Sequence, residues 1–288
     1  MSCAVCDAGG PTPRVLSGTV NFVLVDKPKP HIALVTLNRP ERMNAMAFDV
    51  MIPLKETLEA ISHDNTVRAV VVTGAGRGFC SGADQTSAGR PPHIDGLTRP
   101  SVALRAMEML DDVVHAFRRM HQPVIGAING AAIGGGFCLS LATDIRIAST
   151  EAYFRAAGIN NGLTASELGL SYLLPRAIGS SRAFEIMLTG RDVTATEAER
   201  IGLVSKVTEP DALIDECVDL ADRISEFSRP GIELTKRTLW SGLDAASLAQ
   251  HMNQEGLGQL LVRMSTDNFE EATRARKEKR RPVFRDEL

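Results

Sequence analysis

The stretch Val124-Ile-Gly-Ala-Ile-Asn-Gly-Ala-Ala-Ile-Gly-Gly-Gly-Phe137 decides the fold class, because it joins a strand to a helix through a glycine-rich turn. Its first five residues form an apolar run that ends at Asn129-Gly130, which is typical of a short buried strand. Gly134-Gly-Gly136 then opens a helix, whose free N–H groups lie at the positive end of the helix dipole. The segment therefore predicts one strand–turn–helix unit of an α/β core.

The same alternation continues on both sides of this unit. Strands are predicted at residues 69–73 and 144–148, and a hairpin at residues 21–26 and 31–37. Apolar residues spaced by three and four predict helices over residues 47–61 and around 107–121. A long loop at residues 86–100 separates these two helices. This order predicts an α/β core with largely parallel strands.

After Gly158 the pattern becomes mostly helical. Helices are predicted over residues 166–178, 181–188, 195–201, 212–224, 232–241 and 247–264, and a strand only over residues 203–207. Basic side chains gather within residues 274–285. Such a cluster suits either a solvated charged helix or an anion-binding patch, for instance for a phosphate.

The composition excludes several classes of protein. Of the 288 residues 44% are hydrophobic and 23% charged, and the net charge is −3, which is typical of a globular chain. There is no basic excess for nucleic acid, and no run approaches the roughly 18 apolar residues of a membrane helix. The first residues contain neither a basic segment nor an apolar one. We therefore expect no nucleic-acid partner, no membrane span, no secretory signal and a cytoplasmic location.

Cysteine and histidine patterns argue against metal and hydrolase sites. The five cysteines are scattered and odd in number, which fits a reducing compartment better than a disulfide framework. Cys3 and Cys6 have C-x-x-C spacing, but no second pair completes a zinc set, and we interpret them as part of a tail. Ser81 is not part of a G-x-S-x-G motif, which would mark the nucleophile of a hydrolase. Phe79 stands where a dinucleotide-binding motif would need its third glycine. No metal and no nucleotide cofactor is expected.

Two glycine-containing loops, residues 79–84 and 130–137, each follow a predicted strand. Their glycines allow the backbone to approach a ligand closely. Two N–H groups aimed at one carbonyl oxygen would form an oxyanion hole. Plain tight packing between strand and helix explains the same glycines equally well, so both interpretations stay open.

Several segments, in order along the chain, resemble the enoyl-CoA hydratase/isomerase family, also called the crotonase superfamily. They are Ala33-Leu-Val-Thr-Leu-Asn-Arg-Pro-Glu-Arg-Met-Asn-Ala45, Phe79-Cys-Ser-Gly-Ala-Asp84, the stretch from Pro123 to Gly136, Leu174-Pro-Arg-Ala-Ile-Gly179 and Ala198-Glu-Arg-Ile-Gly-Leu-Val204. Residues 160–172 are similar to a subgroup common in actinobacteria.

This resemblance implies a crotonase-like ββα spiral core that binds acyl-CoA at residues 20–210. Residues 1–19, which are rich in glycine, proline and serine, are interpreted as a flexible leader. The resemblance also implies a helical C-terminal trimerisation region at residues 211–288, often in a dimer of trimers. The substrate would be an acyl-CoA thioester, so coenzyme A is part of the substrate and no separate cofactor is needed. Ala83 and Gly135 would donate N–H groups to the thioester enolate. The implied substrate-binding positions are Arg42, Ala45, Ser81, Asp84, Gln85, Gly134, Cys138, Gly158, Lys279 and Phe284. Lys279 and Phe284 would contribute to the substrate site of a neighbouring subunit.

Hydratases of this family use two glutamates to activate one water, because hydration needs one group to take a proton and one to give it. The corresponding positions here are Cys138 and Gly158, so both carboxylates are missing. Glu167 remains, either as a base that shuttles a proton between two carbons or as a helix N-terminal acid after a cap at Thr164 or Ser166.

Three functions stay open from the sequence. The first is an enoyl-CoA hydratase, a lyase, which is the name that the resemblance favours and which would need an atypical acid, Glu167 first. The second is an enoyl-CoA double-bond isomerase with Glu167 as its only base, and the third is a catalytically silent acyl-CoA-binding paralogue. Asp84 is a second candidate acid, unless it only fixes its loop. Cys138 is either a nucleophile, if the helix N-terminus lowers its pKa, or an inert buried residue.

Overall fold

The larger of two sheets contains six strands in the order β1-β2-β3-β5-β7-β10. This computed structural model describes residues 21–285. The strands are β1 (Val23–Lys29), β2 (Ile32–Leu37), β3 (Ala69–Gly74), β5 (Val124–Ile128), β7 (Ile145–Ser149) and β10 (Lys206–Thr208). β1 and β2 form an antiparallel hairpin, and every later pair is parallel. The predicted hairpin and the largely parallel α/β core are therefore confirmed.

The second sheet was missed by the sequence analysis. It consists of β4 (Gly78–Cys80), β6 (Ala131–Ile133), β8 (Tyr153–Arg155) and β9 (Asp192–Thr194), which are parallel except for β9. Each strand has three residues, which is too short for an alternating pattern to stand out. The prediction of a single strand after residue 158 was also wrong, because β9 precedes β10.

The helices largely follow the predicted order. They are α1 (Phe48–Ser62), α2 (Arg99–Arg119), α3 (Gly135–Ala142), α4 (Leu170–Ile178), α5 (Ser180–Thr189), α6 (Ala195–Arg200), α7 (Leu213–Ser225), α8 (Arg229–Gly242), α9 (Leu248–Ser265) and α10 (Asn268–Lys277), with short turns η1 (Pro40–Arg42), η2 (Ile159–Asn161) and η3 (Pro210–Ala212). α2 begins earlier than predicted, so the loop before it ends at residue 98. α10 includes the first part of the basic cluster.

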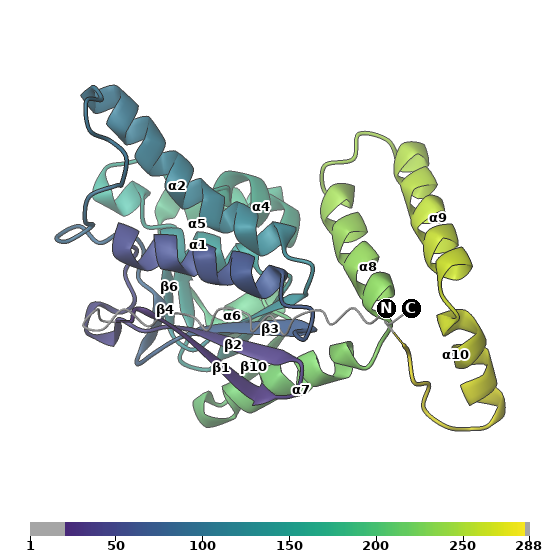
Figure 1. The fold of residues 1–288 in the computed structure, drawn as a ribbon. Coiled ribbons are helices and arrows are strands. Elements are labelled where there is room, and N and C mark those ends of the chain that lie inside the picture. Colours follow the sequence, from purple (N-terminus) through teal and green to yellow (C-terminus); the bar gives the residue numbers. More distant parts are fainter. Residues whose placement is uncertain (1–20, 286–288) are drawn as a thin grey trace, which may run out of the picture.

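The core lies on both faces of the larger sheet, because alternate residues of each strand point in opposite directions. In β3, Val70 and Val72 belong to the apolar cluster that α1 and α3 complete. Ala69 and Val71 face the other way and pack with α7. Figure 1 shows the sheet between α1 on one side and α7 on the other. A strand that is apolar on both faces needs this double cover.

Of the last three helices, α8 packs against one side of this body, and α9 and α10 lie beyond it (Figure 1). α9 lies along α8, and none of its residues is buried in the single chain. α7 also belongs to the predicted C-terminal region at residues 211–288, but it packs on the sheet. The predicted leader at residues 1–19, with Cys3 and Cys6, lies outside the described residues.

Candidate active site

Two loops leave the same edge of the smaller sheet, because β4 and β6 run parallel and pair directly. Cys80 at the end of β4 pairs with Ala132 of β6, so the chain leaves both strands at one place. Gly82 has a φ of 83°, and a β carbon on it would lie 2.6 Å from the Ile133 carbonyl oxygen and 3.4 Å from the Gly135 nitrogen. The two loops therefore touch through their backbones, which glycine at position 82 permits.

The two predicted amide donors lie in these loops, and within residues 21–285 neither has an acceptor. Gly135 is the first residue of α3, where N–H groups lack intrahelical partners. Ala83 forms an isolated bridge with Met46. In this bridge the Met46 amide donates to the Gly82 carbonyl at 2.7 Å, and the Asp84 amide donates to the Met46 carbonyl at 2.9 Å. The bridge leaves the Ala83 N–H free for a ligand.

Close packing also contributes to the glycine-rich turn. Gly134 has a φ of 53°, and its amide donates to the Arg155 carbonyl at 2.8 Å, which ties the turn to β8. A β carbon on Gly136 would collide with the carbonyl oxygen of Cys80. Tight packing therefore explains Gly136, whereas the free donor at Gly135 leaves the oxyanion-hole prediction open.

Glu167 lies beside the glycine-rich turn, half-buried, in the segment before α4. Its Oε1 is 3.2 Å from the point that a β carbon on Gly134 would occupy. In the described part of the chain, this carboxylate has no hydrogen-bond or ion-pair partner. Burial raises the pKa of Glu167, because the charged form loses solvation. An unpartnered carboxylate with a raised pKa beside amide donors suits proton transfer.

The alternative interpretation of Glu167 as a helix N-terminal acid is wrong. α4 begins only at Leu170, and no side chain caps it. Leu168 has a φ of 45°, in the left-handed region, which interrupts the helix predicted from residue 166. The Thr164 hydroxyl donates to a backbone carbonyl at 3.2 Å instead of accepting from an amide.

Cys138 is fully buried near the start of α3. Its thiol donates to the carbonyls of Gly134 at 3.3 Å and Glu167 at 3.4 Å. Burial first, and the charge of Glu167 second, raise the pKa of this thiol well above its usual range. This environment opposes a nucleophilic role. The thiol instead connects the glycine-rich turn to the segment that carries Glu167.

Asp84 is fully engaged in holding its own loop. Its carboxylate accepts from the amides of Thr86 at 2.9 Å and Ser87 at 2.8 Å, and pairs with Arg39 Nη1 at 2.9 Å. The two amide hydrogen bonds, helped by the guanidinium charge, lower the pKa of Asp84 to about 2. This geometry favours the loop-fixing interpretation over an acid–base role.

Most of the other implied substrate-binding residues surround the first loop. The Ser81 hydroxyl donates to the Arg42 carbonyl at 3.2 Å, and the Ala45 amide donates to the same carbonyl at 3.1 Å. Arg42 Nη1 donates to the Thr86 hydroxyl at 2.8 Å. Gln85 is exposed on the same loop. The structure thus brings Arg42, Ala45, Ser81 and Gln85 together.

Gly158 has no room for a side chain. A β carbon there would collide with the backbone carbonyl of Thr164. The Gly158 carbonyl accepts the amides of Asn161 at 3.1 Å and Leu163 at 3.0 Å. A glutamate at this position would therefore displace the backbone of the segment that leads to Glu167.

Lys279 and Phe284 are not brought to these loops within one chain. Lys279 follows α10, and Phe284 lies in the tail beyond it. Figure 1 places α10 far from β4 and β6. The resemblance assigns these two residues to a neighbouring subunit, which stays a prediction.

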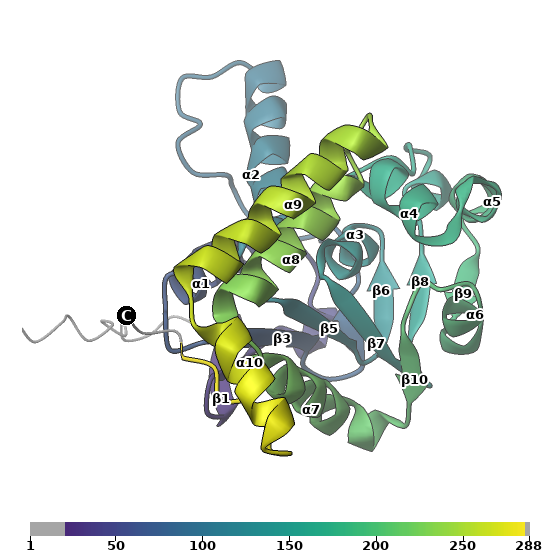
Figure 2. The same ribbon diagram turned by 90° about the vertical axis from the view of Figure 1, so that its right-hand side faces the viewer.

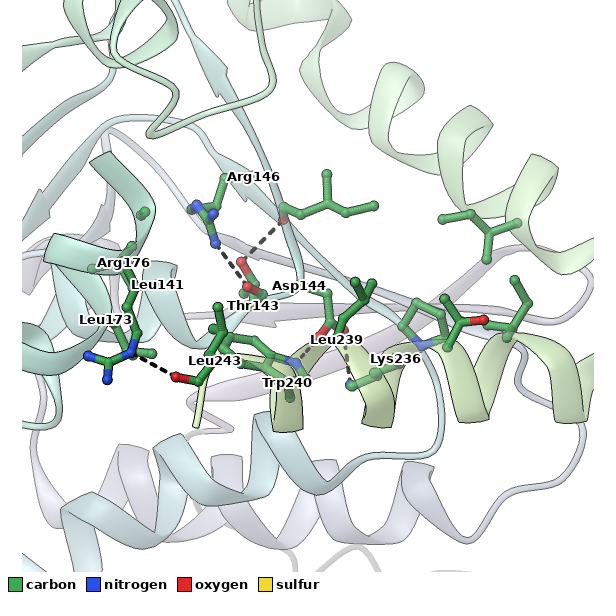
Figure 3. A pocket seen from close by; sticks show the side chains of 16 residues that line it. Leu141, Thr143, Asp144, Arg146, Leu173, Arg176, Lys236, Leu239, Trp240 and Leu243 are labelled. Atoms are coloured by element: carbon green, nitrogen blue, oxygen red, sulfur yellow. Dashed lines mark hydrogen bonds and ion pairs between the residues drawn. The ribbon is translucent and has the colours of Figure 1, made fainter. Parts of the chain in front are cut away.

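A separate cavity of about 380 Å³ lies between the core and α8. Figure 3 shows its lining, which includes Leu141, Leu173, Leu239 and Trp240. None of the predicted site residues lines it. This cavity is therefore distinct from the candidate active site.

Sequence reasoning missed three supporting side chains around the two loops. Met46 and Leu168 contact Gly135, and Arg39 pairs with Asp84. Apolar residues carry no chemical signal that separates a site wall from the core. Arg39 lies in a quoted segment, but its partner is far away in sequence and is identified only by the fold.

The described residues also lack two other kinds of feature. No helix within residues 21–285 is long and apolar enough to cross a membrane. Nor do three His, Cys, Asp or Glu side chains in this range gather closely enough to hold a metal ion.

Comparisons with known proteins agree on one family. The family model described as Enoyl-CoA hydratase/isomerase matches residues 28–287. The Probable enoyl-CoA hydratase EchA12 of Mycobacterium tuberculosis (strain ATCC 25618 / H37Rv) is 71% identical over 93% of this chain and 94% of its own length. The crystal structure of a probable enoyl-CoA hydratase/isomerase from Mycobacterium abscessus is 72% identical with a TM-score of 0.89, over 93% of this chain and 100% of that one.

A third relative has a different description. The crystal structure of a monofunctional enoyl CoA isomerase from M. smegmatis is 64% identical with a TM-score of 0.70. It covers 81% of this chain and 99% of that one. Close relatives of the chain are thus described both as hydratases and as an isomerase.

Proposed function

Because the chain belongs to the enoyl-CoA hydratase/isomerase family and has its crotonase-like fold, we propose that it is an enoyl-CoA isomerase. It would move the double bond of a 3-enoyl-CoA thioester into conjugation with the thioester carbonyl. Glu167 acts as its one acid–base group, and the amides of Ala83 and Gly135 stabilise the enolate oxygen.

The observation that carries this proposal is the single free carboxylate beside the two amide donors. Glu167 borders the glycine-rich turn without a partner in the described part of the chain. Asp84, the acid on the first loop, is held by two amides and Arg39. Hydration needs one group to activate water and another to deliver a proton, whereas isomerisation reuses one group.

The reaction then needs no other reactant. Glu167 removes a proton from the carbon next to the thioester carbonyl, and the electron pair moves onto the carbonyl oxygen. Two amide hydrogen bonds stabilise this oxyanion, and each such donor typically contributes about 3 kcal/mol to transition-state stabilisation. Glu167 returns the same proton to the far carbon of the former double bond, which leaves the 2-enoyl thioester and regenerates the carboxylate.

The rest of the substrate is coenzyme A. Arg42 and Ala45 lie beside the first loop and would contact the nucleotide part of coenzyme A. Ser81 and Gln85 lie on the same segment of chain and would also contact the substrate. In a trimer or a dimer of trimers, Lys279 and Phe284 of a neighbouring subunit would also contact coenzyme A. We propose a cytoplasmic location and no resident cofactor.

Hydration is the second candidate function, because the M. tuberculosis relative is named a probable enoyl-CoA hydratase. It requires a second group to activate water, and neither Cys138 nor Gly158 can supply a carboxylate. A silent acyl-CoA-binding protein would keep the amide donors and show no turnover. The isomerase described from M. smegmatis, 64% identical, supports isomerisation over both.

The decisive experiment compares 3-hexenoyl-CoA with crotonyl-CoA on the same enzyme preparation. We expect a rise in 2-enoyl thioester absorbance from 3-hexenoyl-CoA and little loss of it from crotonyl-CoA. Glu167→Gln should lower kcat for isomerisation by about 10²–10⁴-fold, the usual contribution of a general base. Glu151→Gln, a change at an exposed glutamate, serves as the matched control and should leave kcat unchanged.

Three results would overturn the proposal. Rapid hydration of crotonyl-CoA would make the chain a hydratase with a relocated acid–base group. Isomerisation that survives Glu167→Gln would remove Glu167 from the chemistry. Binding of both esters without any turnover would favour the silent paralogue.

A further inference from the structure

Two apolar side chains enclose the peptide of Gly135, the proposed second oxyanion donor. The Met46 sulfur occupies the space where a β carbon on Gly135 would lie. Leu168 Cδ1 is 3.3 Å from the same point. Both residues are almost completely buried, with Met46 4% and Leu168 6% exposed. The position of Gly135 is therefore set by packing from two directions.

Met46 also fixes the first donor. Its backbone forms both hydrogen bonds of the bridge around Ala83, at 2.7 Å to Gly82 and 2.9 Å from Asp84. One residue thus holds the Ala83 loop through its backbone and contacts Gly135 through its side chain. Met46 is therefore in contact with the segments that carry both donors.

Leu168 connects the same peptide to the proposed base, because it directly follows Glu167. Its φ of 45° is unfavourable for a branched residue. Such strain persists only where the surroundings hold the residue in place. The buried contact of Leu168 with Gly135 provides that restraint and points the preceding carboxylate toward the turn.

We propose that Met46 and Leu168 are positioning residues, which together set the distances between the Ala83 amide, the Gly135 amide and the Glu167 carboxylate. This inference rests on the proposed function. It differs from ordinary core packing in one respect, because loss of either side chain should impair catalysis more than it impairs folding. A displacement of about 1 Å at a reacting group can cost about 100-fold in rate.

The test uses Met46→Ala and Leu168→Ala, with the size-conserving variants Met46→Leu and Leu168→Met. We expect each alanine variant to lower kcat for 3-hexenoyl-CoA by about 10- to 100-fold, while KM changes by less than about threefold. The size-conserving variants should restore most of kcat. Val218→Ala is the matched control, because Val218 is 5% exposed but belongs to α7, in the core on the other face of the larger sheet.

A second readout does not depend on turnover. Acetoacetyl-CoA forms an enolate that absorbs in the near ultraviolet, so its bound enolate fraction reports the two amide donors directly. We expect this absorbance to weaken in both alanine variants and to be unchanged in Val218→Ala. All variants would also be compared by thermal melting.

The outcomes separate this inference from the proposed function. Alanine variants that keep wild-type kcat and enolate absorbance would overturn the positioning role. The positioning role would also be overturned if kcat and enolate absorbance fell no further than Val218→Ala lowers them for the same drop in melting temperature. If the wild type does not isomerise but its bound enolate absorbance depends on Met46 and Leu168, the positioning role stands and the isomerase proposal fails.

Discussion

At the residue scale, the chemistry of the candidate site depends on which acid is left without a partner. Glu167 and Asp84 are both carboxylates at the two loops, and their surroundings shift their pKa values in opposite directions. Burial raises the pKa of Glu167, whereas amide hydrogen bonds lower the pKa of Asp84 to about 2. A base must be able to accept a proton near the working pH, so Glu167 suits catalysis and Asp84 suits loop structure.

The pH dependence of catalysis should follow from Glu167. Only the deprotonated carboxylate removes a proton, so kcat/KM for 3-hexenoyl-CoA should fall as the pH drops through the Glu167 pKa. Because burial raises that pKa, the acid limb should lie above the ordinary glutamate value of 4.5. A pH–rate profile measures it directly. If the residual activity of Glu167→Gln falls over the same acidic pH range, the titrating group is not Glu167.

At the element scale, α8 is attached to the core by a buried polar cluster. Lys236 Nζ pairs with Asp144 Oδ2 at 2.9 Å and donates to the carbonyls of Phe117 at 3.1 Å and Gln122 at 2.8 Å. The Trp240 indole N–H donates to Asp144 Oδ1 at 2.6 Å. Figure 3 shows Lys236 and Trp240 side by side on α8, both directed at Asp144. This cluster fixes how the C-terminal helices leave the body.

Removing the charge of Lys236 should therefore destabilise the protein. The Lys236 side chain is 4% exposed, and burial lowers its pKa. Lys236→Met should lower the free energy of unfolding by about 3 kcal/mol, because the carboxylate of Asp144 stays buried without its cation. Urea unfolding would measure the change, with Lys277→Met at an exposed position as the control. Equal midpoints for the two variants would contradict this role.

At the scale of the whole molecule, the C-terminal helices leave apolar surface uncovered in the single chain. On α9 the exposed side chains include Leu257 (68%), Leu260 (57%) and Leu261 (57%). Figure 2 shows α9 on the outer side of α8, away from the sheets. An uncovered apolar surface of this kind is typical of an interaction face, which agrees with the proposed homo-oligomer.

We expect the protein to exist in solution as three or six copies of the 31.0 kDa chain. Leu257→Glu combined with Leu261→Glu should shift the mass toward the monomer, because charges would be buried between subunits. Leu104→Glu, at a leucine 62% exposed on α2, is the matched control. Sedimentation velocity would measure both. A wild-type protein that sediments as a monomer would contradict the prediction.

The sequence by itself determined the α/β class, the β1–β2 hairpin and most helices. Apolar runs and helical spacing act over short distances, so they are readable without a fold. It also placed Ala83, Gly135 and Glu167 as candidates, through the quoted glycine-rich segments and the family resemblance. The four short strands of the second sheet were missed, because a strand of three residues is too short to show the alternation of apolar and polar residues.

Only the tertiary structure decided which of these residues meet. The parallel pairing of β4 with β6 brings the two loops together. The left-handed backbone at Leu168 delays the start of the predicted helix to Leu170 and places Glu167 beside Gly134. The contacts of Met46 and Leu168 with Gly135, and of Arg39 with Asp84, join segments far apart in sequence. Such contacts depend on packing in three dimensions, and a local pattern of residue types does not encode them.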